Sequence, residues 1–186
     1  IPLAGPANKQ GRVVADNIAG RDVTYGGALG TAVARVFALG AGCVGLSERA
    51  CRRAGIACRS MIIHANSHAG YYPGAELLSV KLVYAPDGKL LGGQAVGRDG
   101  ADKRLDVLAA YLAMGGTVAD LVRFESAYAP PYGSARDAVN VAALAAENQL
   151  TGTVQTVFCT EVAAWVAAGV QVLDVCIVGE FRRGYI

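Results

Sequence analysis

The sequence lacks a long hydrophobic run and a strong charge bias, and each absence narrows the range of functions. No uninterrupted apolar stretch among the 186 residues approaches the about 18–20 residues that a membrane-spanning helix needs, which argues against a membrane protein. The net charge of +2 is small and evenly scattered, whereas a nucleic-acid-binding domain concentrates basic residues on one face. We therefore expect neither a membrane nor a nucleic acid as partner.

The chain also lacks an initiating Met, a signal peptide and any Cys-x-x-Cys pair. Its first residues, IPLAGPAN, predict a fragment, or a processed or tagged form, of a longer protein, and the cysteine usage described next predicts a cytoplasmic one. The cysteine count of five is odd, and without a paired motif it indicates neither a disulfide framework nor a zinc site. Reduced structural thiols are the expectation for all of them: Cys43, Cys51, Cys58, Cys159 and Cys176.

Motifs for binding metals and phosphates are missing as well. His64 and His68 have the i, i+4 spacing of a helical metal pair, but the Gly-Tyr-Tyr-Pro that follows argues against a helix there, and no third ligand is suitably spaced. We therefore expect no metal. No Ser elbow, P-loop or Gly-x-Gly-x-x-Gly opens a helix after a strand. In GADKRLD, Lys103 and Arg104 lie beside carboxylates, which predicts a solvated helix face rather than an anion site.

Local signals mark several helices and strands. Ser47 is a candidate N-cap and Gly55 ends the same short helix, while Thr117 caps another helix. The Gly-rich segment 40–42 predicts a turn between two strands within residues 31–46. The expected helices cover residues 5–20, 47–55, 99–115, 117–124 and 134–150, and a further strand covers residues 58–66.

The clearest hairpin lies in LLSVKLVYAPDGKLLGGQAVG, residues 77–97. Two β-type runs flank PDGK, whose Asp-Gly supplies the positive φ that a tight turn needs. The next helix places Leu105, Leu108 and Leu112 on one face. Strands, a helix, the hairpin and further helices in this order predict an α+β domain, an antiparallel sheet with helices packed on one face. The last of these helices has a small-residue face suited to close packing, made of Val139, Ala142, Ala143 and Ala146.

After about Thr151 the pattern changes. The segment TEVAAWVAAGVQVLDVCIVGEFRRGYI predicts a helix, then a buried strand over residues 170–175, then the start of another helix. That strand has hardly any partner within the sequence, which supports the expectation that the chain is truncated at this end too.

Two segments that contain proline, NSHAGYYPGA (66–75) and SAYAPPYGSARD (126–137), carry four of the eight tyrosines. Tyrosine is a neutral hydrogen-bond donor and acceptor, and a loop stiffened by proline aims its hydroxyl at little entropic cost. Such hydroxyls can contact a bound ligand or a developing thiolate. They can equally pack in a subunit interface, where aromatic residues are common. The residues alone leave both interpretations open.

Four collinear segments are distinctive: PLAGPANKQGRVVADNI, HANSHAGYYPGA, VGRDGADKRLDVL and AYAPPYGSARDAVN. In this order and at these separations they resemble the C-terminal part of the coenzyme A-disulfide reductases, which are FAD-dependent pyridine nucleotide-disulfide oxidoreductases of the single-cysteine type. The resemblance covers Ile1–Leu150. It implies that residues 1–22 are the last helix of an FAD-binding domain and residues 23–150 the dimerisation domain. It places the FAD domain, the NAD(P)H domain and the redox cysteine before Ile1.

The tail VQVLDVCIVGEFRRGYI is similar to the beginning of a rhodanese-like domain, whose usual pattern is Leu-Asp-Val-Arg, then Glu-Phe, then Gly-His-Ile. Cys176 stands where Arg is usual, and Tyr185 stands where His is usual. The rhodanese active-site loop would lie beyond Ile186. Residues 151–186 are therefore expected to be a truncated rhodanese-like start that performs no sulfur transfer, and Cys176 is not its nucleophile.

The resemblance also implies site residues. Tyr71 and Tyr128 match the family tyrosines that reach the active-site cysteine of the partner subunit, so they are the expected catalytic pair. Relatives with two redox cysteines use a histidine in the corresponding loop, and AYAPPYGSARD has none, so Tyr128 is expected to hydrogen-bond the sulfur. Tyr72 and Tyr132 are expected to pack, and Arg136 to contact a coenzyme A phosphate. The residues expected to lie against the flavin, at a helix start, are Leu3, Ala4 and Gly5.

The resemblance implies a homodimer in which electrons pass from NAD(P)H through FAD to coenzyme A disulfide, a persulfide or a polysulfide. The chain itself lacks the redox cysteine and the nucleotide-binding domains, so we expect it to hold no cofactor alone and to act as a dimerisation module. An NADH oxidase or peroxidase on the same scaffold is one alternative, although such relatives generally lack the YYPG and AYAPPY pair. A purely structural association domain is the other.

Overall fold

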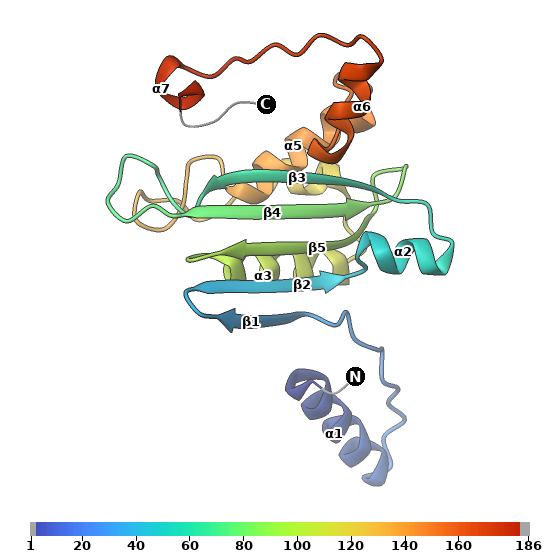
Figure 1. Cartoon of the computed structure of the whole chain (residues 1–186). Helices are drawn as coiled ribbons and strands as arrows, with labels where there is room; N and C mark the ends of the chain where they lie inside the picture. Colours follow the sequence, from blue (N-terminus) through green and yellow to red (C-terminus); the bar gives the residue numbers. More distant parts are fainter. Residues whose placement is uncertain (1–2, 183–186) are drawn as a thin grey trace. The chain divides into compact units, whose positions relative to one another are not determined.

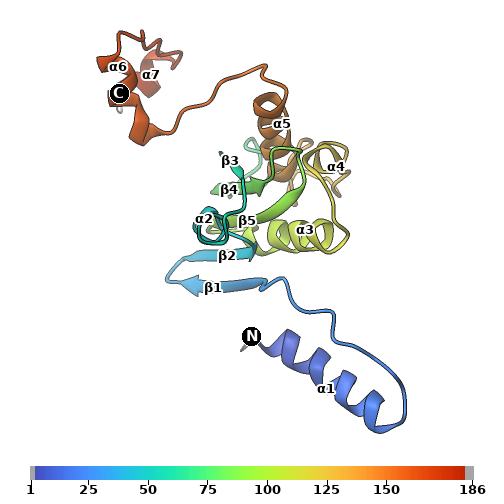
Figure 2. The same cartoon turned by 90° about the vertical axis from the view of Figure 1, so that its right-hand side faces the viewer.

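The computed structural model describes residues 3–182 (Figures 1 and 2). The chain divides into two compact units between Thr153 and Val154. The first unit is built on a five-stranded sheet with the order β1-β2-β5-β4-β3, and every pair of neighbouring strands is antiparallel. Its elements in chain order are α1 (Ala4–Ile18), β1 (Ala32–Val36), β2 (Leu39–Gly45), α2 (Glu48–Ala54), β3 (Arg59–Asn66), β4 (Leu77–Tyr84), β5 (Leu90–Gly97), α3 (Ala101–Ala113), α4 (Val118–Val122) and α5 (Ala138–Leu150).

Helices pack on one face of this sheet, as Figure 2 shows for α3, α4 and α5. α3 lies against β2 and β5, and α5 lies against β3 and β4. Along β4, Leu78, Val80, Leu82 and Tyr84 are fully buried, because every second residue of a strand points to the same face. The predicted α+β class is thus confirmed. The helices add buried residues at the predicted positions: Leu105, Leu108, Val139, Ala142, Ala143 and Ala146.

Most helix ends and the main hairpin fall where the local signals predict them. Ser47 caps α2 through its side chain, and Gly55 ends the helix in the left-handed conformation, with φ of 66°. Thr117 caps α4. The β4–β5 hairpin is present, and Gly88 of the PDGK turn has φ of 88°, a value that side chains disfavour.

One predicted turn is misplaced. The segment 40–42 lies inside β2, and the chain reverses earlier, at Phe37, which has φ of 53°. A Cβ atom on Gly42 would lie 2.4 Å from a backbone oxygen of β1 and 2.5 Å from Leu105 Cδ1. Glycine is required here because α3 and β1 approach the strand closely, and not because the chain turns.

The second unit contains a 3-10 helix (Cys159–Glu161), α6 (Val162–Ala167) and α7 (Val178–Phe181). The two predicted helices are present, but the prediction of a buried strand over residues 170–175 is wrong. These residues form no regular element, and Leu173 and Val175 are 85% and 86% exposed. A strand must pair its backbone groups, and none of the described residues offers this segment a neighbouring strand.

Some predictions fall on residues outside the described part. Tyr185, compared above with a rhodanese-like pattern, lies there, as do the outer ends of the predicted segments 1–22 and 151–186. Within residues 3–182, no helix is both long enough and apolar enough to cross a membrane.

Candidate functional site

Two loops carry the tyrosines singled out in the sequence. The Tyr71 loop (residues 67–76) joins β3 to β4, and the Tyr128 loop (residues 123–137) joins α4 to α5. The hydroxyl groups of Tyr71 and Tyr128 are hydrogen-bonded at 2.9 Å, although 57 residues separate them. Both side chains are accessible, with exposed fractions of 77% and 47%. The structure therefore brings together the two residues expected to act as a pair.

The hydroxyl pair is a neutral hydrogen-bonding unit. One phenol donates to the other, which leaves one hydroxyl hydrogen free to donate to a third group. The hydrogen bond to Tyr71 raises the pKa of Tyr128, so Tyr128 keeps its proton throughout the neutral range. An exposed donor of this kind suits an atom that gains negative charge during a reaction, such as the sulfur of an opening disulfide.

The Tyr71 loop is closed by its own hydrogen bonds. The Ser67 N–H donates to Glu76 O at 2.8 Å, and the Glu76 N–H donates to Ser67 Oγ at 3.2 Å. The buried His68 lies between Ser67 Oγ, 3.2 Å from Nδ1, and Pro73 O, 3.3 Å from Nε2. Because a carbonyl oxygen only accepts, neutral His68 carries its proton on Nε2, and Nδ1 accepts from the Ser67 hydroxyl. His68 thus ties together the two sides of the loop that presents Tyr71.

The Tyr128 loop is tied to α5 at both ends. Near the start of the loop, Asn140 Nδ2 donates to Phe124 O at 2.8 Å, and it also donates to Leu121 O, in the last turn of α4, at 3.0 Å. At its end, Asp137 Oδ1 accepts the Val139 N–H at 3.0 Å and caps α5. The Asp137 N–H in turn donates to Asn140 Oδ1 at 3.2 Å. Helix capping therefore fixes the ends of the loop that presents the second tyrosine.

Arg104 of α3 contradicts the prediction of a solvated helix face. Its side chain is 2% exposed, and it forms a two-point ion pair with the similarly buried Asp137, at 2.7 Å (Nη2–Oδ2) and 3.2 Å (Nε–Oδ1). A further bond runs from Nη2 to Ser67 O at 2.8 Å. The neighbouring Asp102 and Asp106 are exposed, as expected of the solvated face. The ion pair is possible because loop residues beyond the helix supply acceptors that the sequence pattern does not show.

Sequence reasoning missed several of these residues, although some of them carry a signal. Arg104 lies four residues before Leu108 and within the same buried stripe of α3, a spacing typical of an inward-facing position. Asp137 and Asn140 have the three-residue spacing of a capping box. Ser67 carries no comparable signal, because its contacts depend on how the Tyr71 loop folds.

The other expected site residues of the two loops differ in their surroundings. Arg136 is exposed, and it lines a hollow of about 510 Å³ together with residues 122–126. Tyr72, expected to pack, contacts His68 edge to face, with ring centroids 5.9 Å apart. Tyr132, also expected to pack, is 73% exposed. Arg136 and Tyr132 are therefore free to contact another molecule.

The expected flavin contacts lie at the start of α1. Leu3 is the N-cap, makes no side-chain capping bond, and is followed by no acidic residue in the first turn. A Cβ atom on Gly5 would meet nothing within 4 Å, so the surface there is open. Backbone N–H groups at a helix start attract an acceptor or a negative charge. Leu3, Ala4 and Gly5 thus lie at an open helix start, and their contact with a flavin stays a prediction.

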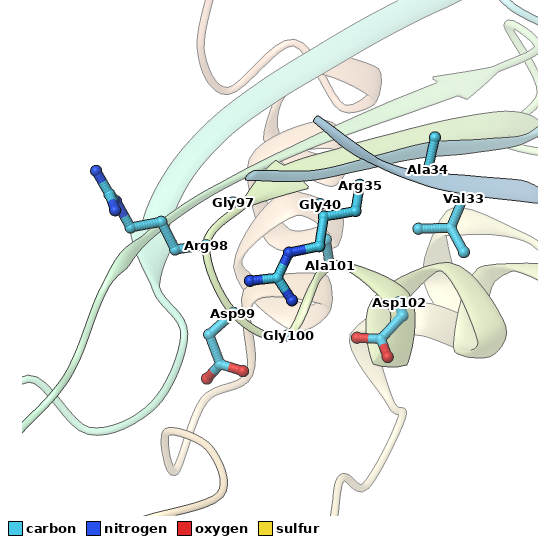
Figure 3. A pocket seen from close by; sticks show the side chains of 10 residues that line it. All are labelled: Val33, Ala34, Arg35, Gly40, Gly97, Arg98, Asp99, Gly100, Ala101 and Asp102. Carbon is cyan, nitrogen blue, oxygen red and sulfur yellow. The ribbon is translucent and has the colours of Figure 1, made fainter. Parts of the chain in front are cut away.

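A hollow of about 320 Å³ lies where β5 runs into α3 (Figure 3). Its charged lining residues are Arg35, Arg98, Asp99 and Asp102. In Figure 3 the Arg98 side chain points away from the other three. With Arg98 pointing away, Arg35 lies with two carboxylates, so the hollow has no excess of positive charge to attract an anion, and we assign it no ligand.

The histidines and cysteines form no metal site in the part of the chain that the structure describes, where no group of three or more His, Cys, Asp and Glu side chains is placed to hold an ion. His64 lies within β3, where Nδ1 is 2.8 Å from Ser79 Oγ of β4. Cys43, Cys51, Cys58 and Cys159 form no disulfide within the described residues, and burial raises the pKa of the Cys51 thiol.

Comparison with known proteins identifies the class to which this fold and site belong. Residues 31–139 match the family model of the pyridine nucleotide-disulphide oxidoreductase dimerisation domain, and the matched region is more than half of the chain. The chain therefore belongs to this family.

Individual relatives narrow the likeness further. The chain is 34% identical to a coenzyme A disulfide reductase of Staphylococcus epidermidis over 143 residues, which are 76% of this chain and 32% of the relative. It matches a crystal structure of reduced Bacillus anthracis CoADR-RHD with 46% identity and a TM-score of 0.94, over 100% of this chain and 34% of that one. A NAD-dependent persulfide reductase from A. fulgidus matches with 34% identity and a TM-score of 0.82, over 84% and 30% of the two chains. The chain thus spans about a third of the length of these relatives, and the likeness to coenzyme A disulfide reductases is confirmed.

Proposed function

We propose that this chain is the dimerisation part of a cytoplasmic flavoprotein that reduces coenzyme A disulfide, or a persulfide, with NAD(P)H. The names of the related reductases support this substrate class. Residues 1–22 would be the last helix of an FAD-binding domain, residues 23–150 the dimerisation domain, and residues 151–186 the start of a rhodanese-like domain. In the net reaction, one disulfide, one NAD(P)H and one proton give two thiols and NAD(P)+.

The hydrogen bond between Tyr71 and Tyr128 is the observation that carries this proposal. In a homodimer, each protomer would present its exposed hydroxyl pair to the redox cysteine of its partner. When a disulfide opens, the departing sulfur becomes negative, and a phenol that donates a hydrogen bond stabilises it. Because the pKa of Tyr128 is raised, this donor retains its proton at the pH of the cytoplasm. Arg136, exposed at the end of the same loop, would contact a phosphate of coenzyme A.

The start of α1 supports the cofactor assignment. FAD, when bound, supplies the two-electron link between NAD(P)H and the sulfur. Leu3, Ala4 and Gly5 would lie against it, and the backbone N–H groups of the first turn would donate toward negative charge on the ring. The absence of an acidic residue in this turn leaves the positive end of the helix dipole uncompensated by the chain's own side chains.

The test is turnover of coenzyme A disulfide by the flavoprotein that contains this chain. Replacing Tyr71 and Tyr128 by Phe removes both hydroxyls and keeps the rings. We expect kcat/KM to fall by about 10²-fold, as for loss of a positioned proton donor, while the protein stays dimeric. Tyr132→Phe is the matched control, because it removes an exposed hydroxyl from the same loop. Wild-type turnover by the double variant would leave the chain a purely structural association domain.

Measurement of oxygen consumption on the same samples separates the reductase from the alternative on this scaffold. A reductase oxidises NAD(P)H only when a disulfide or persulfide is added. Oxidation of NAD(P)H with stoichiometric loss of oxygen, and without a sulfur substrate, would instead identify an NADH oxidase.

A further inference from the structure

Arg104 connects three segments that meet beside the tyrosine pair. Its guanidinium donates to Ser67 O, at the start of the Tyr71 loop, at 2.8 Å. It donates to both carboxylate oxygens of Asp137, at the end of the Tyr128 loop, at 2.7 and 3.2 Å. It also donates to Gly100 O, at the start of its own helix, at 3.3 Å. One side chain on a rigid helix therefore holds one end of each tyrosine loop.

The groups around the Arg104 guanidinium enclose it closely. Gly100 has φ of 73°, and a Cβ atom there would lie 2.2 Å from Arg104 Nη1. Asp137 is 2% exposed; both of its carboxylate oxygens accept from Arg104, and Oδ1 also accepts the Val139 N–H at the start of α5. The planar guanidinium matches a carboxylate at two points and still has a donor for a third acceptor. A lysine would meet these acceptors only as a single point charge.

Stability alone does not account for the burial of this ion pair. Desolvation offsets much of the attraction in a buried pair, and apolar residues of similar volume are often at least as stable in its place. An apolar pair, however, would not fix Ser67 O relative to Asp137. The loops also share one direct backbone bond, from the Ala69 N–H to Gly133 O at 2.8 Å, and Arg104 adds the link between Ser67 and Asp137.

We propose that Arg104 is the positioning residue of the tyrosine pair: by fixing both loops to α3, it holds the hydroxyls of Tyr71 and Tyr128 within hydrogen-bond distance. Arg104 acts through the loops and is not a catalytic residue. Its effect on turnover rests on the function proposed above, whereas its effect on the geometry of the pair does not.

The first test uses a variant of the whole flavoprotein in which both charges are removed together, Arg104→Met with Asp137→Ser. Serine keeps a capping oxygen for α5, so the variant is expected to fold, with an unfolding midpoint near that of the parent. We expect kcat/KM for coenzyme A disulfide to fall by about 10²-fold, as for a small misplacement of reacting groups. When both tyrosines are already Phe, the same change should cause no further loss, because the groups that Arg104 positions are gone.

The second test probes the hydrogen bond between Tyr71 and Tyr128 and does not depend on enzyme activity. The ultraviolet titration of Tyr128 is taken as the difference between each protein and its own Tyr128→Phe counterpart. Because the hydrogen bond to Tyr71 raises the pKa of Tyr128, we expect this phenol to ionise at lower pH in the Arg104→Met, Asp137→Ser variant. Arg59→Lys is the matched control. Arg59 also bonds a backbone carbonyl of α5, Gln149 O at 3.2 Å, but from the start of β3, the end opposite the Tyr71 loop.

The outcomes are distinct. A folded variant with unchanged turnover and an unchanged Tyr128 titration would overturn the positioning role, and so would equal losses of kcat/KM with and without the two tyrosines. If the Phe variants keep full turnover, the proposed catalytic function of the tyrosines fails, and the titration alone decides the role of Arg104. Should the double variant not fold, Arg104→Lys with Asp137 intact is submitted to the same two measurements, with the same result expected.

Discussion

Tyr84 provides a pH-dependent test of how the core is built. Its side chain, at the end of β4, is 0% exposed, and its hydroxyl donates to Gln149 Oε1 of α5 at 2.6 Å. Burial raises the pKa of Tyr84 from 10.0 to about 12, against a smaller opposite effect of the positive charge on Arg59. The informative change is Tyr84→Phe, which removes the ionisable hydroxyl and keeps the ring in the core.

The sign of the effect follows from proton binding. Between the ordinary pKa of 10.0 and the raised value of about 12, the folded chain keeps the Tyr84 proton and the unfolded chain loses it. Stability therefore falls as pH rises through this window, because the unfolded state binds fewer protons there. Below pH 10.0 the contribution is fully present. A shift of two units corresponds to about 2–3 kcal/mol in the free energy of unfolding.

Urea unfolding followed by circular dichroism, from neutral pH upward, measures this contribution. The parent chain should lose about 2–3 kcal/mol more than Tyr84→Phe across the alkaline window. At neutral pH, Tyr84→Phe should be the less stable protein by about 1 kcal/mol, the value of the lost hydrogen bond. Gln149→Ala is the control: it removes the acceptor but leaves the phenol buried, so the alkaline loss should persist. Equal alkaline losses in the parent and Tyr84→Phe would refute the assignment of the raised pKa to burial.

Two further predictions concern a close contact and a helix cap. Gly42→Ala should lower the free energy of unfolding by about 1–3 kcal/mol, because the added Cβ would lie 2.5 Å from Leu105 Cδ1. Gly11→Ala lies within α1, where an added Cβ atom would meet nothing within 4 Å, and should instead stabilise the helix by about 0.5–1 kcal/mol. Urea unfolding measures both changes in the free energy of unfolding, and effects of the same sign would contradict the packing account. Thr117→Ala should cost about 1 kcal/mol and raise the pKa of Asp120, which bonds from Thr117 keep below its ordinary value. NMR titration of the Asp120 carboxylate checks this, and an unmoved pKa would argue against the capping box.

The features that could be predicted from the sequence are those whose signals are local. Ser47, Gly55 and Thr117 mark helix ends because their own atoms or conformations satisfy the terminal backbone groups. The β4–β5 turn depends only on the positive φ that Gly88 adopts. In each case the residue that carries the signal also makes the contact, so no knowledge of the rest of the fold is needed.

The wrong predictions concern residues whose structural roles depend on contacts with distant parts of the chain. Gly42 is a glycine because Leu105 packs against it, and in the sequence it looks like a turn. Arg104 is buried because Ser67 and Asp137, 37 and 33 residues away, supply acceptors. A sequence displays a charge but not the groups that compensate its burial. The tyrosine pair is of the same kind: no local pattern places two hydroxyls 57 residues apart at 2.9 Å, and the expectation that they act together came from the family resemblance.

Comparison of β4 with residues 170–175 shows what a pattern of apolar residues leaves undecided. β4 has β3 on one side and β5 on the other, so its backbone groups are paired and its apolar side chains are covered by helices. Residues 170–175 are also rich in β-type apolar residues, yet they form no strand and remain exposed. The pattern states which side chains favour burial, but a neighbouring strand decides whether burial occurs. Under the domain assignment proposed above, the rest of a rhodanese-like domain would supply that neighbour. The exposed tyrosine pair likewise needs a neighbour that this chain does not supply: under the proposed function, that neighbour would be a sulfur of the partner protomer.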